Sequence, residues 1–245
     1  MPNLTFRSAT RILSSPLAGV EKRCLVWLAH RLPAWINSDH LTGLALAAMF
    51  GAGAAFAAAS THVAWVLLVL PCLALNWFGD SLDGTLARVR GHERPRYGFY
   101  VDHVLDAVGT LALVGGLALS GFMSPIVALG VLGAYYLISI EVYLATYTLG
   151  SFRITYAGFG PTELRILLAI GVVRVFYRPT ATIAGHTWLL FDVAGVIAIA
   201  GLLVVTAVSI MVHLRALYLA EPLVRSRRGE VQGERGENVF LLPLS

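Results

Sequence analysis

This sequence has few charged residues, very few cysteines and almost no lysine. Only 13% of its 245 residues are charged, two are cysteines, and Lys22 is the single lysine. Soluble globular domains carry about 25% charged residues. Cys24 and Cys72 form no C-x-x-C motif, which argues against a disulfide framework or a thiolate metal site. An ordinary soluble domain and a cysteine-based scaffold are therefore both excluded.

Apolar residues fill the chain instead. They make up 57% of it, and the mean hydropathy is +0.74. Six apolar segments are long enough to cross about 30 Å of hydrocarbon as helices. They cover approximately residues 40–59, 63–87, 98–120, 124–149, 161–177 and 188–214. The sequence thus predicts an all-α integral membrane protein with six transmembrane helices, of which the fifth is the shortest and contains Arg165 and Arg174.

The arginines predict the orientation of these segments. They gather before the first segment, between the second and third, between the fourth and fifth, and after the sixth. The turns near 60–62 and 121–122 contain no Lys or Arg, and only Arg178 in the 177–187 turn departs from the trend. Because basic residues are retained on the cytoplasmic side, both termini are predicted to face the cytoplasm across the inner membrane. Arginines at the ends of apolar segments mark topology, so no nucleic-acid partner is expected.

The chain is predicted to have three parts. Residues 1–36 contain a stretch, 12–36, that mixes leucines with basic residues and includes Trp27 and Trp35, a pattern typical of an amphipathic helix in the membrane interface. Residues 37–220 would form the six-helix domain that carries the site described next. The tail, 221–245, is polar and rich in Gly, Glu and Arg, which predicts disorder.

Four of the six aspartates interrupt the second and third apolar segments. They stand in the frame Asp80-x2-Asp83-Gly84-x2-Ala87-Arg88-x9-Gly98-x3-Asp102-x3-Asp106. The first two aspartates are three residues apart and the last two are four apart, so on helices each pair shares a face. Charge within a membrane is costly, and four carboxylates repel one another, so a cation is needed. Carboxylate oxygens suit hard divalent cations such as Mg²⁺, Mn²⁺ or Ca²⁺.

This frame resembles the signature of the CDP-alcohol phosphotransferase family, D-x2-D-G-x2-A-R-x8/9-G-x3-D-x3-D, and matches every fixed position within residues 80–106. The resemblance implies a membrane transferase of phospholipid biosynthesis. Such an enzyme moves a substituted phosphate group from a CDP-linked donor, CDP-diacylglycerol or another CDP-alcohol, to a lipid or alcohol acceptor and releases CMP. Two divalent cations, Mg²⁺ or Mn²⁺, are implied as cofactors. The resemblance is also compatible with a homodimer.

The resemblance also implies roles for the aspartates. Asp80, Asp83 and Asp102 would bind the metals, and Asp106 would bind metal, take the proton of the acceptor hydroxyl as the catalytic base, or do both. Without the resemblance, the same carboxylates are explained by a structural ion-pair network with the nearby basic residues Arg88, Arg90 and Arg94.

The small residues of the frame are implied to bind the nucleotide. Gly84, Ala87 and Gly98 would leave room for the cytidine, since a missing side chain lets a ligand approach the backbone. Arg88 would reach phosphate oxygens or cap the end of its helix. The alternative for both glycines is close helix packing, which is common in membranes.

Five polar residues outside the frame are candidates for the acceptor site or for supporting contacts: Asn37, Thr42, Glu141, Glu163 and Arg165. At Asn37 and Thr42 a nucleotide contact competes with N-capping by Ser38 or Asp39. Residues 160–165, Gly-Pro-Thr-Glu-Leu-Arg, are similar to strings in some branches of the family, and acceptor binding or a link to the active site competes there with helix capping. Glu141 lies too deep for solvent and requires a partner, such as an arginine or an acceptor hydroxyl.

Two rival functions fit the composition. A divalent-cation transporter would use the same carboxylates as an ion path, with acidic groups spread through the membrane depth. Here they concentrate towards the predicted cytoplasmic side, and Asp192 alone lies near the other. An inactive lipid-binding scaffold would have no need of the intact set of four aspartates.

Overall fold

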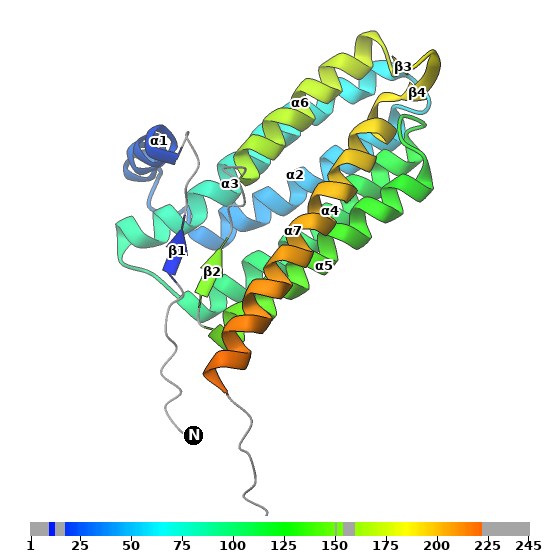
Figure 1. Cartoon of the computed structure of the whole chain (residues 1–245). Coiled ribbons are helices and arrows are strands. Elements are labelled where there is room, and N and C mark those ends of the chain that lie inside the picture. Colours follow the sequence, from blue (N-terminus) through cyan, green and yellow to red (C-terminus); the bar gives the residue numbers. More distant parts are fainter. Residues whose placement is uncertain (1–9, 13–17, 150, 154–159, 222–245) are drawn as a thin grey trace, which may run out of the picture.

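The computed structural model describes residues 10–12, 18–149, 151–153 and 160–221, and these form a bundle of long helices (Figure 1). The elements in chain order are β1 (Thr10–Ile12), α1 (Ala18–Arg31), α2 (Ser38–Ala58), the 3-10 helix η1 (Val63–Leu68), α3 (Val69–Arg90), α4 (Pro95–Leu119), α5 (Pro125–Leu149), β2 (Ser151–Arg153), α6 (Pro161–Tyr177), β3 (Thr180–Ile183), β4 (His186–Leu189) and α7 (Leu190–Ala220). β1 pairs with β2 in parallel, and β3 pairs with β4 in antiparallel fashion. The predicted disorder of the tail falls almost entirely outside the described residues.

Five helical segments are long and apolar enough to cross a membrane: α2, η1 with α3, α4, α5 and α7. Each overlaps one of the predicted apolar segments. α6 coincides with the predicted segment 161–177, but it has only 17 residues, includes Arg165 and Arg174, and is not one of the five. The prediction of an all-α membrane protein is therefore confirmed, while the sixth span stays a prediction.

The outward faces of the long helices are apolar. Ile197 and Leu214 of α7 are 67% and 65% exposed, and Leu129 of α5 is 66% exposed. Contiguous apolar surface of this kind is unfavourable in water and favourable against lipid chains. The chain is therefore embedded in a membrane.

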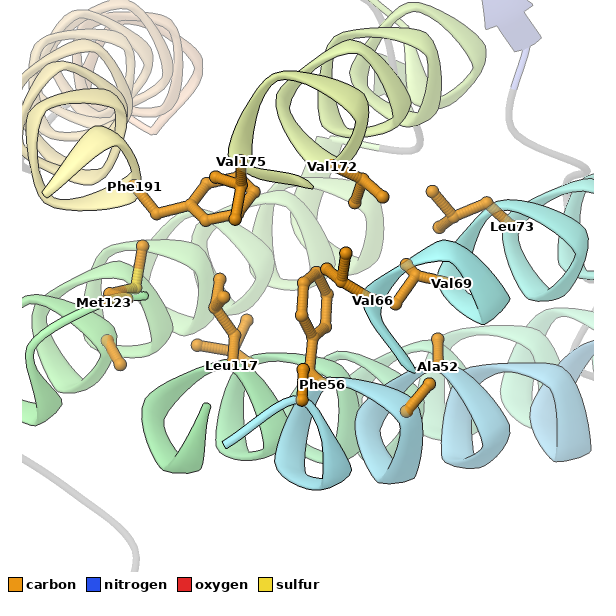
Figure 2. Close-up of a cluster of buried hydrophobic side chains, with 14 residues drawn as sticks. Ala52, Phe56, Val66, Val69, Leu73, Leu117, Met123, Val172, Val175 and Phe191 are labelled. Atoms are coloured by element: carbon orange, nitrogen blue, oxygen red, sulfur yellow. The ribbon is translucent and has the colours of Figure 1, made fainter. Parts of the chain in front are cut away.

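The largest apolar cluster lies where α2 and α6 end and α7 begins (Figure 2). Phe56, Val66, Val172 and Val175 have no exposed surface. Phe56 meets Phe191 edge to face with ring centroids 6.0 Å apart, a favourable aromatic arrangement. This cluster fixes one end of the bundle and leaves polar side chains to gather at the other end.

Glycines let α2 approach its two neighbours closely. A Cβ added to Gly116 of α4 would lie 1.9 Å from the carbonyl oxygen of Gly53 in α2, and one added to Gly79 of α3 would lie 2.5 Å from the carbonyl oxygen of Leu41. Backbones in such contact permit no side chain, as is typical of membrane helix crossings. α3 and α4 are thus both held against α2.

A tight turn joins α3 to α4. Gly91, with φ of +66°, ends α3 in the left-handed conformation that favours glycine, and the amide of His92 donates to the carbonyl oxygen of Ala87. Pro95 then begins α4, where the missing N–H costs nothing. Because only residues 91–94 separate them, the acidic turns of the two helices lie close to the same end of the bundle.

The predicted N-terminal helix corresponds to α1. Its Leu25 and Ala29 are buried together with Leu82 and Leu86 of α3. Trp27, by contrast, is 52% exposed. The apolar side of α1 therefore packs largely on the protein rather than standing free for lipid.

Candidate metal centre

The four aspartates of the frame line one small cavity between α2, α3 and α4. Its other lining residues are Thr42, Ala45, Leu46, Met49, Asn76 and Leu105. The cavity has a volume of about 20 Å³, and space for one water-sized particle needs about 10–15 Å³. The acidic turns of α3 and α4, which are separate in the sequence, are thus brought together in one polar cavity within the membrane domain.

Three of these carboxylates form a tighter group. One ligand oxygen each of Asp80, Asp102 and Asp106 lies within 4.8 Å of the other two. Oxygens bind Mg²⁺ at about 2.1 Å and Ca²⁺ at about 2.3–2.6 Å, so this spacing is within reach of a shared cation. An all-oxygen, all-carboxylate donor set also suits such a hard cation. The residues present therefore fit a divalent metal.

Asp83, the fourth carboxylate, is hydrogen-bonded to α2. Its Oδ2 accepts a hydrogen bond of 2.7 Å from Thr42, and its backbone carbonyl accepts one of 2.8 Å from Ser38. Thr42, a candidate for nucleotide contact, here orients a carboxylate of the cavity. Asp83 lines the same cavity but is not one of the three carboxylates of the tight group.

Arg165 of α6 is bonded to Asp80. Its Nη2 donates to Asp80 Oδ2 at 2.6 Å, and its Nε donates to Asn76 Oδ1 at 2.8 Å. Asn76 is 5% exposed and donates in turn to the carbonyl oxygen of Ala45. Of the open alternatives for Arg165, a link to the acidic site is the one observed.

The basic residues at the end of α3 and in the following loop have other partners. Arg88 donates to Thr85, and Arg90 donates to carbonyl oxygens of the segment after α1, including those of Leu32 and Pro33. Arg94 forms an ion pair of 2.5 Å with Asp39, and this hydrogen bond raises the pKa of Arg94 above its ordinary value. Arg90 and Arg94 thus support the loop, which weakens the ion-pair explanation of the aspartate cluster.

The motif glycines differ from the packing glycines. A Cβ on Gly98 would meet nothing within 4 Å, and one on Gly84 would meet only guanidinium nitrogens of Arg88, at 3.5 Å or more. Neither position has the backbone contact seen at Gly79 or Gly116. Helix packing therefore does not explain Gly84 and Gly98, and both positions have open space around them.

A second, larger pocket of about 250 Å³ adjoins the ends of α2 and α3. Its lining includes the predicted nucleotide residues Asn37 and Ala87, with Ser38, Asp39, Leu86, Arg90, His92 and Arg94. The lining carries two arginines and one aspartate, and of these Arg94 and Asp39 are paired with each other. Among the residues that line it, neither Gly84 nor Gly98 is found.

Two of the candidate polar residues cap helices. Asn37, rather than Ser38 or Asp39, is the N-cap of α2, and its Oδ1 accepts from the amide of His40 at 3.0 Å. Glu163 accepts from the amide of Gly160 at 2.9 Å at the start of α6. For these two residues the capping alternative is the contact observed.

Glu141 belongs to a different polar cluster, between α5 and α7. Its carboxylate accepts from the hydroxyl of Ser209 at 2.8 Å and lies 2.6 Å from Nδ1 of His213. Glu141 is not among the residues that line the aspartate cavity. Its partners come from α7, not from Arg165 or the metal centre.

Two residues that support the site, Asn76 and Glu21, were not predicted from the sequence. Asn76 was detectable as a polar residue one helical turn before Asp80 within an apolar run. Glu21 of α1 accepts hydrogen bonds from Trp77 at 2.7 Å and from Thr162 at 3.0 Å. No local pattern signals this contact, because it joins three separate helices.

Comparison with known proteins adds no assignment. No protein-family model matches the chain, and no curated protein matches it significantly. A functional interpretation therefore depends on the motif in residues 80–106 and on the arrangement of its side chains.

Proposed function

We propose that this chain is a metal-dependent CDP-alcohol phosphotransferase of the membrane. The observation that carries the proposal is the meeting of four motif aspartates from two helices in one cavity, with open space at Gly84 and Gly98. The donor is CDP-diacylglycerol or another CDP-alcohol, and the acceptor is a lipid or alcohol hydroxyl. A lipid donor or a lipid acceptor carries long apolar chains. A cavity inside a membrane bundle suits such substrates, because their chains can stay in the lipid while the polar group enters the cavity.

In the proposed mechanism, Asp80, Asp83, Asp102 and Asp106 would hold two divalent cations, Mg²⁺ or Mn²⁺. When bound, the cations would neutralise the diphosphate of the donor and the charge that develops on the phosphate of the leaving CMP. The acceptor oxygen forms the new bond to the phosphorus that bears the alcohol, and the bond to the oxygen of CMP breaks. Asp106 takes the acceptor proton, because it is the motif carboxylate farthest along α4 from the loop at 91–94, where a hydroxyl that enters from the membrane would reach it.

The direct test is nucleotide release by purified protein in lipid nanodiscs. With Mg²⁺, CDP-diacylglycerol or a CDP-alcohol and a panel of acceptors, CMP should be released. EDTA should abolish release, and excess Mg²⁺ or Mn²⁺ should restore it, because the carboxylates cannot hold the diphosphate without cations. Full activity in the chelated preparation would refute the metal-dependent mechanism.

We infer that the cytidine of the donor occupies the space beside Gly84 and Ala87, with Asn37 and the arginines of the larger pocket near it. Gly84→Leu should then fill the open space and weaken CDP binding at least tenfold, measured by calorimetry in saturating Mg²⁺. Gly43→Leu is the matched control, since Gly43 is an exposed α2 glycine whose added Cβ would meet nothing within 4 Å. Unchanged CDP affinity in Gly84→Leu would place the nucleotide elsewhere.

The proposed topology has six spans, with α6 as the short one, both termini in the cytoplasm and the active site on that side of the inner membrane. A 17-residue helix rises about 25 Å, close to the thickness of the hydrocarbon core. In this arrangement α1 lies along the cytoplasmic surface, with Trp27 at headgroup depth. These positions follow the distribution of arginines along the chain.

Labelling of single cysteines checks this topology. In a variant with Cys24 and Cys72 replaced by alanine, Arg94→Cys should be protected from an impermeant thiol reagent in intact cells, and Thr61→Cys in the opposite turn should react. The reason is that the 91–94 loop faces the cytoplasm in the proposal. The reverse labelling pattern would invert the topology and separate the site from its cytoplasmic donor.

The rival transporter receives little support from the acidic residues. Asp192, near the other end of the bundle, accepts hydrogen bonds from the amide and the hydroxyl of Ser124, at 2.6 and 3.0 Å, next to the start of α5. It therefore has a structural role that an ion path does not require. The aspartate cavity is small and is lined by residues of α2, α3 and α4.

A further inference from the structure

One cationic side chain of the protein is already bonded to an aspartate of the acidic site. The guanidinium of Arg165 is 2.6 Å from Asp80, and the two side chains are only 17% and 20% exposed. Asp80 also belongs to the group of three carboxylates that can share a metal. Arg165 and a divalent cation therefore draw on the same carboxylate.

Arg165 has further anchors beside Asp80. Its Nε is bonded to the buried Asn76, and the helix it stands on is fixed at its first turn. There, Thr162 donates to Glu21 of α1, and Glu163 caps the helix. A guanidinium anchored in this way stays beside Asp80 when the carboxylate takes another partner.

The formal charges indicate what Arg165 does. Four carboxylates and one guanidinium carry three net negative charges, and two divalent cations would convert this to one net positive charge. Without Arg165 the loaded site would be neutral. Once cations bind Asp80, the guanidinium is left partly buried without its full counter-charge, a state that is costly unless an anion arrives. A diphosphate diester supplies two negative charges.

We propose that Arg165 is a counter-ion that changes partner, from Asp80 in the metal-free protein to a phosphate of the donor after the cations have bound. The inference rests on the proposed function and adds an order to it, in which cations precede the donor. Arg165 weakens metal binding by competing for Asp80 and strengthens donor binding by leaving the loaded site positive. The two effects have opposite signs.

Because Arg165 is expected to weaken metal binding and strengthen donor binding, measuring both affinities in one variant tests the proposal. Mn²⁺ binding, followed by electron paramagnetic resonance, and CDP binding in saturating Mn²⁺, followed by calorimetry, are measured on the full chain in nanodiscs. Arg165→Gln should bind Mn²⁺ about tenfold more tightly and CDP about tenfold more weakly, the scale of one lost charge-assisted hydrogen bond. Arg165→Lys keeps the charge but lacks the planar fork, so its Mn²⁺ affinity should stay within about threefold of the wild type.

Arg174→Gln is the matched control. Arg174 is exposed on the same helix and donates to the carbonyl oxygen of Arg178, so both affinities should be unchanged. If Arg165→Gln weakens both affinities, Arg165 is only a structural tie between α6 and α3, and the inference is wrong. Unchanged affinities would also overturn it. A wild-type protein that binds neither Mn²⁺ nor CDP would instead refute the proposed function itself.

Discussion

Asp102→Asn should lower the rate of CMP release by about 10³-fold or more. The amide keeps the shape of the side chain but removes the charge from the group of three carboxylates that lie within 4.8 Å. A metal contributes several kcal/mol to stabilising transition-state charge, and each 1.36 kcal/mol is a factor of ten in rate. Release of CMP and binding of Mn²⁺ should fall together, while the variant still inserts and purifies as the wild type does.

The matched control is Asp192→Asn. The asparagine oxygen can still accept from Ser124 beside α5, so CMP release should remain close to that of the wild type. Activity retained in Asp102→Asn, or lost equally in Asp192→Asn, would contradict a metal centre at the motif aspartates.

Asp106→Asn tests whether Asp106 acts as the base or as a metal ligand, when CMP release and CDP binding are both measured. If Asp106 is the base, this variant loses turnover but keeps metal-dependent CDP binding. If it loses CDP binding as completely as Asp80→Asn does, Asp106 is primarily a metal ligand, and the base is another group.

Gly116→Val should prevent the bundle from folding correctly. Its Cβ would have to occupy a point 1.9 Å from the carbonyl oxygen of Gly53, and neither backbone can yield without separating α2 from α4. Overpacking usually costs about 1–3 kcal/mol, and a clash between two backbones lies at or above the top of that range. The expected result is a much lower thermal midpoint in detergent, or loss of the monodisperse peak in fluorescence-detected chromatography.

Gly115→Val is the control for this experiment. Gly115 is the preceding residue of α4, and a Cβ there would meet nothing within 4 Å. Its thermal midpoint should therefore stay near that of the wild type. Equal stability of the Gly115 and Gly116 variants would show that α2 and α4 do not cross at this point.

The pairing of aspartates was foreseeable from the sequence. Helical periodicity places Asp80 with Asp83 and Asp102 with Asp106, and the short loop at Gly91 requires the two helices to run side by side. The structure brings all four to one cavity. Periodicity does not show that Thr42 binds Asp83, because that contact depends on how α2 is rotated against α3.

The glycines of α3 likewise show what the sequence alone does not determine. Gly79 and Gly84 look alike in the sequence, five residues apart on one apolar helix. In the structure an added Cβ at Gly79 would meet the backbone of α2, whereas one at Gly84 would meet only the flexible end of Arg88. Packing and ligand space are distinguished by what lies across from each glycine, and that depends on another helix.

The order of amino acids alone specifies the long apolar helices, their membrane environment and the faces that carry the acidic pairs, because these properties depend on residues within one or two helical turns. The partners across helices depend on the crossing of the helices. Arg165 reaches Asp80, Glu21 reaches Thr162, and Glu141 reaches Ser209 rather than the metal centre. Each contact joins residues more than 60 positions apart. Their geometry is set by how closely the backbones approach, as at Gly53 and Gly116, and no local pattern encodes it.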